Sequence, residues 1–287
     1  MKIAAVVILY NSTIETITNI KSYYEAVEKI FVFDNTETES LIRHELQTLP
    51  KIEFFHNFEN EGIARRLNQA CQRAIAEKFE WLLTMDQDSS FSQKVIFSYF
   101  NCFKQHNKIN VAVIGTKYGS TIESASTKCD AKEAEDLITS GMLINLSFFE
   151  EIGGFDEALF IDYVDNDYCI RAKMAGYNII QFSNISIVHQ LGQLTNSSSI
   201  KTLFLIKKKK NIHSPLRCYY MYRNMLYLEQ KFKITNKKFA QDTRRHNLAR
   251  IKICMLYGRQ ASEIRKYIKL AKIDFENNKM GKISQEL

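Results

Sequence analysis

Two carboxylates one residue apart stand at the end of an apolar run in the first third of the chain. Asp86 and Asp88 directly follow residues 81–85, which have the length and composition of a buried strand. Carboxylate oxygens suit Mg²⁺ or Mn²⁺, and two of them just past a strand end can converge on one ion and its bound phosphates. The pattern has a structural alternative, in which Asp88 or Ser89 caps the helix that follows.

A second acidic cluster lies in the middle of the chain. Asp162, Asp165 and Asp167 fall within six residues, and Arg171 follows them. If a helix begins near Val164, Asp167 and Arg171 are four residues apart and can form an ion pair on its surface. Asp165 is then left to point elsewhere, and a carboxylate held in a pocket without a permanent cation is a candidate general base. The alternative role is favourable negative charge at a helix N-terminus.

Two further polar residues end apolar strands. Asp34 closes the run "FVFD", where it can accept a hydrogen bond from a base N–H or a ribose hydroxyl, or simply form an Asx-turn. His189 closes "NISIVH", where it is a candidate third metal ligand or diphosphate contact, although a lone histidine is commonly structural.

Two basic segments are candidates for phosphate contact. Asn60 and Gly62 precede a helical pattern that carries Arg66, and a helix N-terminus with glycine access can bind phosphate, although Asn60 as a plain N-cap explains the same residues. Arg217 and Arg223 flank three tyrosines and can neutralise a leaving group by bidentate contact. Their alternative is an amphipathic helix with inward aromatic side chains and solvated arginines.

The elements that must position these residues alternate between strand and helix. Apolar strands are predicted over residues 2–10, 29–34, 51–57, 79–86 and 110–115, and helices over residues 63–78 and 91–103. Ser12 and Glu15 predict a capping box that opens a further helix. The alternation indicates an α/β fold with a parallel sheet covered on both faces, in which ligands bind at the carboxyl ends of the strands.

Charge is unevenly distributed along the 287 residues. Residues 200–287 contain 22 Lys and Arg against 6 Asp and Glu, a net charge of +16, whereas residues 1–199 have a net charge of −9. Basic helices from about Ser214 onward suggest a partner that is anionic. No apolar segment is long enough to span a bilayer and no signal peptide is indicated, and the six scattered cysteines predict reduced thiols in a cytoplasmic protein.

These residues occur within a series of motifs that resembles the family 2 glycosyltransferases of the GT-A fold, and within them the bacterial rhamnosyltransferases. The resemblance covers about residues 3–225. Its motifs, in chain order, are "VVILYN", "FVFDN", "NEGIARRLN", "MDQDSS", "TSGMLIN", "IGGFDEALFIDYVDNDYCIRAKMAGY", "VHQLG" and "YRNMLYL". The long block with the acidic cluster is the most specific of them, and the order of the others adds to it.

The resemblance implies a Rossmann-like α/β fold with a mostly parallel central sheet flanked by helices. It implies a catalytic domain over residues 1–212, with a nucleotide-sugar half over about 1–116 and an acceptor half over about 117–212, and a basic helical region over 213–287. The implied reaction is inverting transfer of a sugar, L-rhamnose from dTDP-β-L-rhamnose, to a hydroxyl of a cell-surface polysaccharide or lipid-linked glycan. The implied cofactor is Mg²⁺ or Mn²⁺.

The resemblance also implies a role for each candidate residue. Asp165 matches the catalytic base. The metal-binding residues would be Asp86, Asp88 and His189. The donor-binding residues would be Tyr10, Asp34, Asn60, Gly62, Arg66, Asp86, Gln87, Arg217 and Arg223, with Tyr10 beside the base. The acceptor-binding residues would be Ser140, Gly141 and Asp162. One departure is Val164, since many family members have glutamate before the catalytic aspartate.

Partners and competing functions follow from the same features. The expected partners are a nucleotide-diphosphate sugar, a glycan acceptor and an anionic inner membrane surface. Residues 207–210 and the helices after them would contact this surface, or would instead form a homodimer. No nucleic acid is expected as a partner. A metal-dependent nucleotidyltransferase or phosphohydrolase lacks its usual motif after the first strand. A nucleic-acid binder leaves the ordered carboxylates unexplained.

Overall fold

The computed structural model describes residues 1–106, 109–119, 129–189, 194–198 and 207–284, and it divides into two compact units. Unit 1 comprises Met1–Glu157 and Val164–Gln190. Unit 2 comprises Ala158–Tyr163 and Leu191–Leu287, so that a short internal segment belongs with the C-terminal part of the chain.

The first half of unit 1 is a parallel sheet, as the alternating pattern predicts. β1 (Ile3–Leu9) lies between β2 (Lys29–Asp34) and β4 (Trp81–Asp86), and β3 (Ile52–His56) pairs with the outer edge of β2. The side chains of β1 and β4 are buried almost without interruption because helices cover the sheet on both faces.

The second half of the sheet is mixed. β8 (Met142–Asn145) runs antiparallel to both β4 and β6 (Val111–Gly119), while β9 (Asn178–His189) runs parallel to β6. Two short strands, β5 (Ser89–Ser90) and β7 (Ala131–Glu133), pair antiparallel with β9. The expectation of an α/β fold is confirmed: the first half of the sheet is wholly parallel, and the second half combines the parallel pair β6–β9 with antiparallel pairs.

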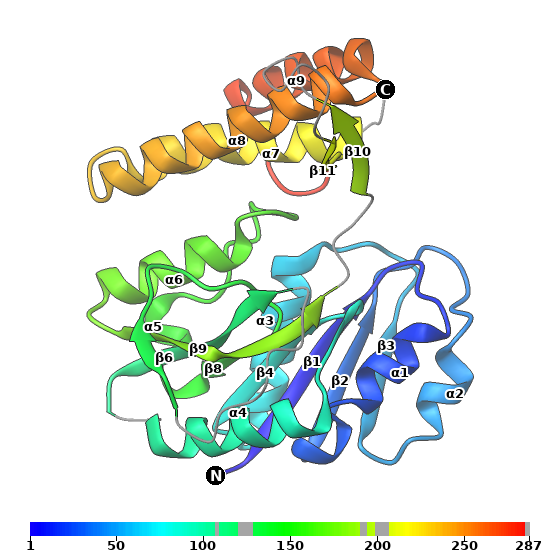
Figure 1. The fold of residues 1–287 in the computed structure, drawn as a ribbon, viewed down its shortest axis with the longest axis vertical. Helices are drawn as coiled ribbons and strands as arrows, with labels where there is room; N and C mark the ends of the chain where they lie inside the picture. The colour runs from blue at the N-terminus through cyan, green and yellow to red at the C-terminus, as the bar shows by residue number, and fades with distance from the viewer. Residues whose placement is uncertain (107–108, 120–128, 190–193, 199–206, 285–287) are drawn as a thin grey trace. The chain divides into compact units, whose positions relative to one another are not determined.

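Helices of unit 1 close the core. α1 (Glu15–Lys21) and α4 (Gln93–His106) place Ile17, Ile20 and Tyr99 in the cluster that buries one face of β1, β2 and β4, and α3 (Ile63–Ala76) packs on β1 and β4 (Figure 1). The capping box predicted from Ser12 and Glu15 is wrong, because the N-cap of α1 is Ile14 and no side chain caps it. The short helices of this unit are η1 (Tyr24–Ala26), α2 (Arg43–Gln47), η2 (Leu146–Phe148) and α5 (Phe149–Ile152).

The helix expected near Val164 is α6 (Val164–Met174), and it carries the predicted ion pair. Arg171 Nε lies 2.8 Å from Asp167 Oδ2, but the pair is not on the helix surface, because Asp167 is fully buried. The same guanidinium donates to the carbonyl oxygens of Ile152 and Gly154. The pair therefore fastens α6 to the turn that precedes it, and the buried carboxylate is matched by a cation whose three nitrogens each donate a hydrogen bond.

Unit 2 is built around α7 (Pro215–Phe232), on which α8 (Lys237–Tyr257) and α9 (Ala261–Glu276) pack. The Ser214 hydroxyl caps α7 by accepting from the Arg217 amide at 3.2 Å, and Pro215 occupies the first turn. The antiparallel pair β10 (Leu194–Ser198) and β11 (Lys207–Asn211) also belongs to this unit. The basic helical region expected from residue 213 is thus helical, while its expected boundary at residue 212 stays a prediction. No described helix is long and apolar enough to cross a bilayer.

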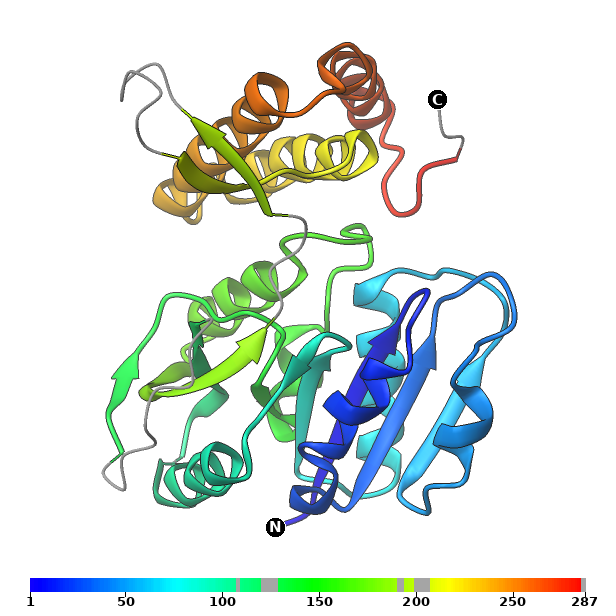
Figure 2. The same cartoon turned by 45° about the vertical axis from the view of Figure 1, so that its right-hand side comes forward.

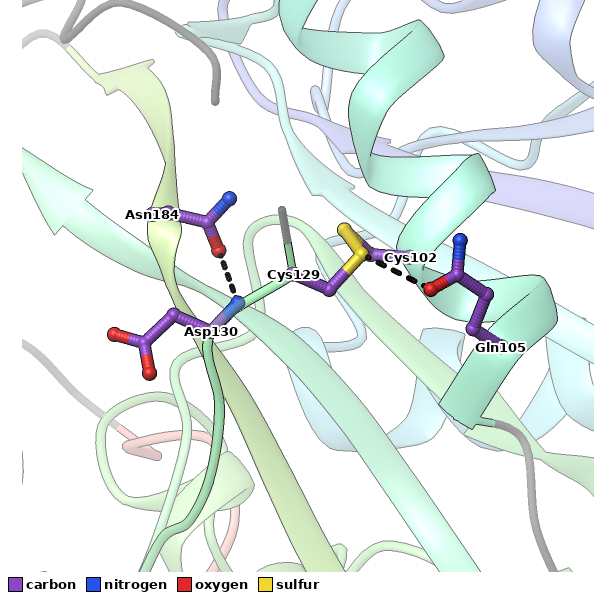
Figure 3. The surroundings of a disulfide bond; sticks show 5 residues. All are labelled: Cys102, Gln105, Cys129, Asp130 and Asn184. Carbon is purple, nitrogen blue, oxygen red and sulfur yellow. Dashed lines mark hydrogen bonds between the residues drawn. A yellow bond between two sulfur atoms is a disulfide. The ribbon is translucent and has the colours of Figure 1, made fainter. Parts of the chain in front are cut away.

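A disulfide corrects the expectation that all six thiols are reduced. Cys102 of α4 and Cys129, just before β7, are bonded with their Cα atoms 5.4 Å apart (Figure 3). Cys71, Cys169, Cys218 and Cys254 are free and buried. The sequence gives no signal for the bond because its two cysteines are 27 residues apart and meet through packing of the sheet edge on α4.

We expect the Cys102–Cys129 bond to stabilise the chain by restricting its unfolded state. A loop of 27 residues corresponds to about 3–4 kcal/mol in the chain-entropy description. Urea unfolding of the Cys129→Ser variant is therefore expected to show a free energy of unfolding lower by about that amount. Wild-type protein unfolded in the presence of dithiothreitol serves as the control and should match the variant. Equal stability of oxidised wild type and variant would show that the bond contributes nothing.

Candidate active site

The candidate site begins with three strands that end at the same edge of unit 1. Leu9 pairs with Asp34 and Ile8 pairs with Asp86, so the ends of β1, β2 and β4 lie side by side. The blue strands β1 and β2 point the same way in Figure 2. Tyr10, which follows β1, is 46% exposed at this edge. The sequence prediction that these residues share one edge is confirmed.

Asp34 is the most unusual residue of the edge. Its side chain is fully buried, and Oδ1 accepts from the Thr36 amide at 2.9 Å, so the Asx-turn alternative is present. Its other oxygen, Oδ2, is buried without a hydrogen-bond partner among the described residues. A buried acceptor left unpaired costs about 1–3 kcal/mol, so this oxygen is an acceptor that a bound ligand can satisfy.

Arg66 forms its hydrogen bonds mainly with the loop that leads to α3. Its Nε donates to Asn35 Oδ1 at 2.8 Å, and its terminal nitrogens donate to Asn57 Oδ1, Gln69 Oε1 and the Glu59 carbonyl, with Glu61 2.8 Å away. Every nitrogen of the guanidinium thus already donates within unit 1. These contacts give Arg66 a structural role in the framework of the site, and its assignment to donor binding stays a prediction.

The start of α3 differs from the simple capping alternative. The N-cap is Gly62, whose φ of +80° is a left-handed value that favours glycine, and no side chain caps the helix. Asn60 instead accepts from the Gly62 amide at 3.1 Å. Asn60 is therefore not the N-cap of α3, and the assignment of Asn60 and Gly62 to donor binding stays a prediction.

The Asp86–Asp88 turn is held by its middle residue. Gln87 Oε1 accepts from the Tyr10 amide at 2.8 Å, and Gln87 Nε2 donates to the Tyr10 carbonyl at 3.0 Å. Because both ends of its amide bind the Tyr10 backbone, Gln87 ties Tyr10 to this turn, and its assignment to donor binding stays a prediction. The capping alternative is wrong: Ser89 lies in β5, and α4 begins at Gln93, where Ser92 accepts from the Val95 amide.

The carboxylates at this edge are suited to a hard cation. Ser89 pairs with His189, so the backbone of β5 brings the end of β9 next to Asp88. The side chain of His189 lies outside the described residues, and the described part of the chain holds no cluster of three or more acidic, histidine or cysteine ligands. Asp86 and Asp88 alone fit Mg²⁺ or Mn²⁺, which commonly complete their shell with waters and substrate phosphates.

Asp165 lies in the first turn of α6 and is held by hydrogen bonds on both oxygens. Oδ2 accepts from the Thr139 amide at 2.9 Å and from its hydroxyl at 3.3 Å, and Oδ1 accepts from the Asn166 amide at 2.9 Å. Burial raises the pKa of the Asp165 carboxyl above its usual value, and the hydrogen bonds oppose part of that rise. A raised pKa in a positioned carboxylate suits proton abstraction near neutral pH.

Ser140 and Gly141 follow Thr139, and both form hydrogen bonds within the protein. Ser140 is buried, and its Oγ accepts from the Asp86 amide at 3.3 Å. The Gly141 carbonyl accepts from the Tyr99 hydroxyl at 2.7 Å, and a side chain at Gly141, whose φ is +76°, would meet Thr116 at 2.8 Å. These contacts show a structural role for both residues, and their expected acceptor contact stays a prediction.

The remaining site candidates belong to unit 2. Asp162 and Arg217 form a bidentate pair at 2.7 and 2.8 Å. Arg223 is 1% exposed and donates to the Tyr219 hydroxyl and to the carbonyls of Lys279 and Gly281, so it fastens the C-terminal segment. Its buried Nε has no hydrogen-bond partner among the described residues, and its assignment to the leaving group stays a prediction. The roles assigned to Asp162 and Arg217 stay predictions.

Asp162 and Tyr163 adopt unusual backbone conformations. Their φ values are +69° and +67°, in the left-handed region that residues with side chains seldom occupy. Asn224 donates to the carbonyls of Ile161 and Asp162, which helps to hold the segment in place. The strained pair stands directly before α6.

Sequence reasoning missed several residues that organise the site. Asn35 and Thr36 shape the turn around Asp34, and Thr84 and Thr139 connect β4 to Asp165. Thr139 begins the motif "TSGMLIN", but nothing in its local sequence indicates a contact with a residue 26 positions away.

Comparison with known proteins identifies the family. The sequence model described as "Glycosyl transferase family 2" matches residues 5–153, which hold Tyr10, Asp34 and the Asp86–Asp88 turn. The chain belongs to glycosyltransferase family 2. This family 2 glycosyltransferase is 24% identical over 245 residues to the dTDP-rhamnosyl transferase RfbF of Shigella flexneri, and the match covers 80% of each chain.

Solved structures show the same fold. The family 2 glycosyltransferase matches the structure of "GalNAc-T7 with UDP, GalNAc and Mn2+" with a TM-score of 0.54 and 12% identity, over 66% of this chain and 43% of that one. It matches S. aureus TarS with a TM-score of 0.50 and 13% identity, over 96% of this chain and 55% of that one. The chain thus spans about half the length of these two structures. The likeness confirms the GT-A fold, and the family establishes glycosyl transfer from a nucleotide sugar, so neither competing function finds support.

Proposed function

We propose that this family 2 glycosyltransferase transfers L-rhamnose from dTDP-β-L-rhamnose, with inversion, to a hydroxyl of a cell-surface polysaccharide or lipid-linked glycan precursor. The observation that carries the proposal is the buried, unpartnered Oδ2 of Asp34 at the edge that also holds Asp86 and Asp88. An acceptor for a base and a carboxylate pair for a metal diphosphate are what a nucleotide-sugar donor requires.

The donor end of the site is assigned from Asp34 and Tyr10. Oδ2 of Asp34 accepts the ring N–H of thymine or uracil, and the exposed Tyr10 ring lies against the base. Both bases carry this N–H, so the preference for dTDP-rhamnose rests on the similarity to the dTDP-rhamnosyl transferase RfbF. The RfbF match covers most of this chain, including residues beyond the family match.

The metal is assigned to Asp88 and Asp86, with His189 as a further ligand. A bound Mg²⁺ or Mn²⁺ would supply neutralisation of the charge that develops on the departing diphosphate. The chain's own contribution is the buried strand β4, which ends at Asp86 and holds Asp86 and the following Asp88 at the edge of the sheet where the donor is proposed to bind. A related structure contains Mn²⁺.

Asp165 acts as the general base. Its carboxylate takes the proton of the acceptor hydroxyl while that oxygen attacks the anomeric carbon, and the bond from this carbon to the diphosphate oxygen breaks on the opposite side. The electron pair leaves with the nucleotide diphosphate, and the configuration inverts. Burial and the resulting raised pKa of Asp165 favour this step.

The Asp165→Asn variant is expected to bind donor normally and to transfer poorly. A positioned general base contributes about 10²–10⁴-fold, so turnover should fall by that factor while the donor dissociation constant is unchanged. Radiolabelled sugar transfer and isothermal titration of the donor with Mn²⁺ measure the two quantities. Turnover equal to that of wild type would remove Asp165 from this role.

The Asp34→Asn variant is expected to lose donor affinity, because its side-chain NH₂ group would face the ring N–H of the base where the wild type has the acceptor Oδ2. Loss of a hydrogen bond to a charged group corresponds to a dissociation constant about 10- to 100-fold higher. Thermal shift against dTDP-rhamnose, UDP-GlcNAc and GDP-mannose, with and without Mn²⁺, measures it, with Asp130→Asn as a control at an exposed carboxylate. Stabilisation by GDP-mannose alone would contradict the assigned donor.

The basic face of unit 2 supports a membrane-bound acceptor. Arg245, Leu248, Lys252 and Leu256 recur every three or four residues along α8, so they share one face, and all four are exposed. Leu248 and Leu256 are 40% and 63% exposed. Exposed leucines between cations are typical of helices that lie on anionic lipid, and a surface there would present a lipid-linked acceptor.

We expect the protein to sediment with vesicles that contain phosphatidylglycerol, at low salt, and not with phosphatidylcholine vesicles. The variant Leu248→Ser/Leu256→Ser should lose most of this binding because it keeps the charge but removes the apolar contacts. Leu41→Ser, at an exposed leucine of unit 1, is the matched control. Absence of binding at low salt would reject the membrane role, and a change from dimer to monomer in the double variant would assign the face to self-association.

A further inference from the structure

Residues 139–141 join the two halves of the candidate site. Ser140 Oγ accepts from the Asp86 amide, and the adjacent Thr139 donates its amide and hydroxyl to Asp165. All of these residues belong to unit 1. A three-residue segment therefore connects the strand that bears the metal carboxylates to the proposed base.

Buried hydrogen bonds with β4 fix the position of residues 139–141 relative to the sheet. Thr84, which is fully buried in β4, donates its hydroxyl to the Thr139 and Met142 carbonyls, and its own carbonyl accepts from the Gly141 amide at 2.9 Å. Hydrogen bonds from both sides leave the Thr139 backbone little freedom. Its amide and hydroxyl consequently face Asp165 in a set geometry.

The two oxygens of Asp165 are not equivalent. Oδ2 accepts two hydrogen bonds, from the Thr139 amide and the Thr139 hydroxyl, whereas Oδ1 accepts one, from the Asn166 amide. The oxygen with fewer donors keeps the more available lone pair. Oδ1 is therefore the oxygen suited to receive a proton.

We propose that Thr139 is a positioning residue for the base: its hydroxyl and amide hold Oδ2 of Asp165 and leave Oδ1 to take the proton of the acceptor hydroxyl. This inference rests on the proposed role of Asp165. Thr139 itself contacts neither donor nor acceptor in the proposal, and it acts through the carboxylate alone.

Hydrogen bonds to the ionised carboxylate also set its proton affinity. The Thr139 donors favour the charged form, while burial and the negative charge of Asp136 favour the neutral form. Asp136 lies in the segment before Thr139 and accepts from the Asn166 side chain, and the Cys169 thiol, whose pKa burial raises, faces Asp165 from α6. Loss of a Thr139 donor removes a hydrogen bond from the ionised carboxylate and therefore raises the pKa of Asp165. Since Asp165 acts as a base only when it is deprotonated, the acid limb of the rate profile then shifts to higher pH.

The test compares Thr139→Val, which removes the hydroxyl at nearly constant shape, with Thr139→Ser, which keeps it. In Thr139→Val the acid limb of kcat/KM is expected to shift upward by about one pH unit, so that activity below the limb falls about tenfold. Thr139→Ser should retain the wild-type limb. Donor affinity and thermal midpoint should be unchanged in both, and Thr139→Ala carries the same expectation as Thr139→Val if the valine variant does not fold.

An unshifted limb in the variants without the hydroxyl would overturn the inference. An equal shift in Thr139→Ser would also overturn it, since packing of the methyl group would then be responsible. Failure of the underlying proposal looks different: Asp165→Asn would keep wild-type turnover. An inactive Asp165→Asn together with an unshifted Thr139→Val would reject the role of Thr139 alone.

Discussion

The parallel pairing of β1 with β2 and β4 is the constraint on which the rest of the site depends. In a parallel sheet the chain must return through a helix, so consecutive strands end at the same edge and their following residues meet there. Apolar side chains buried on both faces hold the strands in one register. Tyr10, Asp34 and Asp86 therefore keep fixed positions relative to one another. Charged groups that would repel one another are thereby held together before any ligand arrives.

Two kinds of buried carboxylate show how the protein separates structure from chemistry. Asp167 is neutralised by Arg171 within its own helix, and this pair serves the fold. Asp34 and Asp165 instead receive hydrogen bonds from backbone amides, and in Asp34 one oxygen is left for a ligand. Incomplete satisfaction of a buried acceptor costs stability, and it is tolerated where binding will complete it.

Sequence reasoning predicted the parallel half of the fold, the edge that carries the site and the start of α6, because hydrophobic periodicity and strand ends are local features. It could not predict β8 antiparallel in the sheet, the Cys102–Cys129 bond, or the contact between Thr139 and Asp165, since each depends on residues far apart in the chain. Arg66, Gln87 and Arg223 show the same limit: their residue types suit a ligand, but the structure shows each of them in hydrogen bonds with backbone or side-chain groups far away in the chain.

The short segment Ala158–Tyr163 makes the two units inseparable as modules. It belongs to unit 2, where Arg217 and Asn224 bind Asp162, yet unit 1 resumes at the next residue with the helix of Asp165. A chain cut at residue 190 would therefore lose the partners that hold two left-handed residues directly before that helix. Replacement of the C-terminal region of this chain would therefore leave Asp162 without these partners unless residues 158–163 were replaced with it.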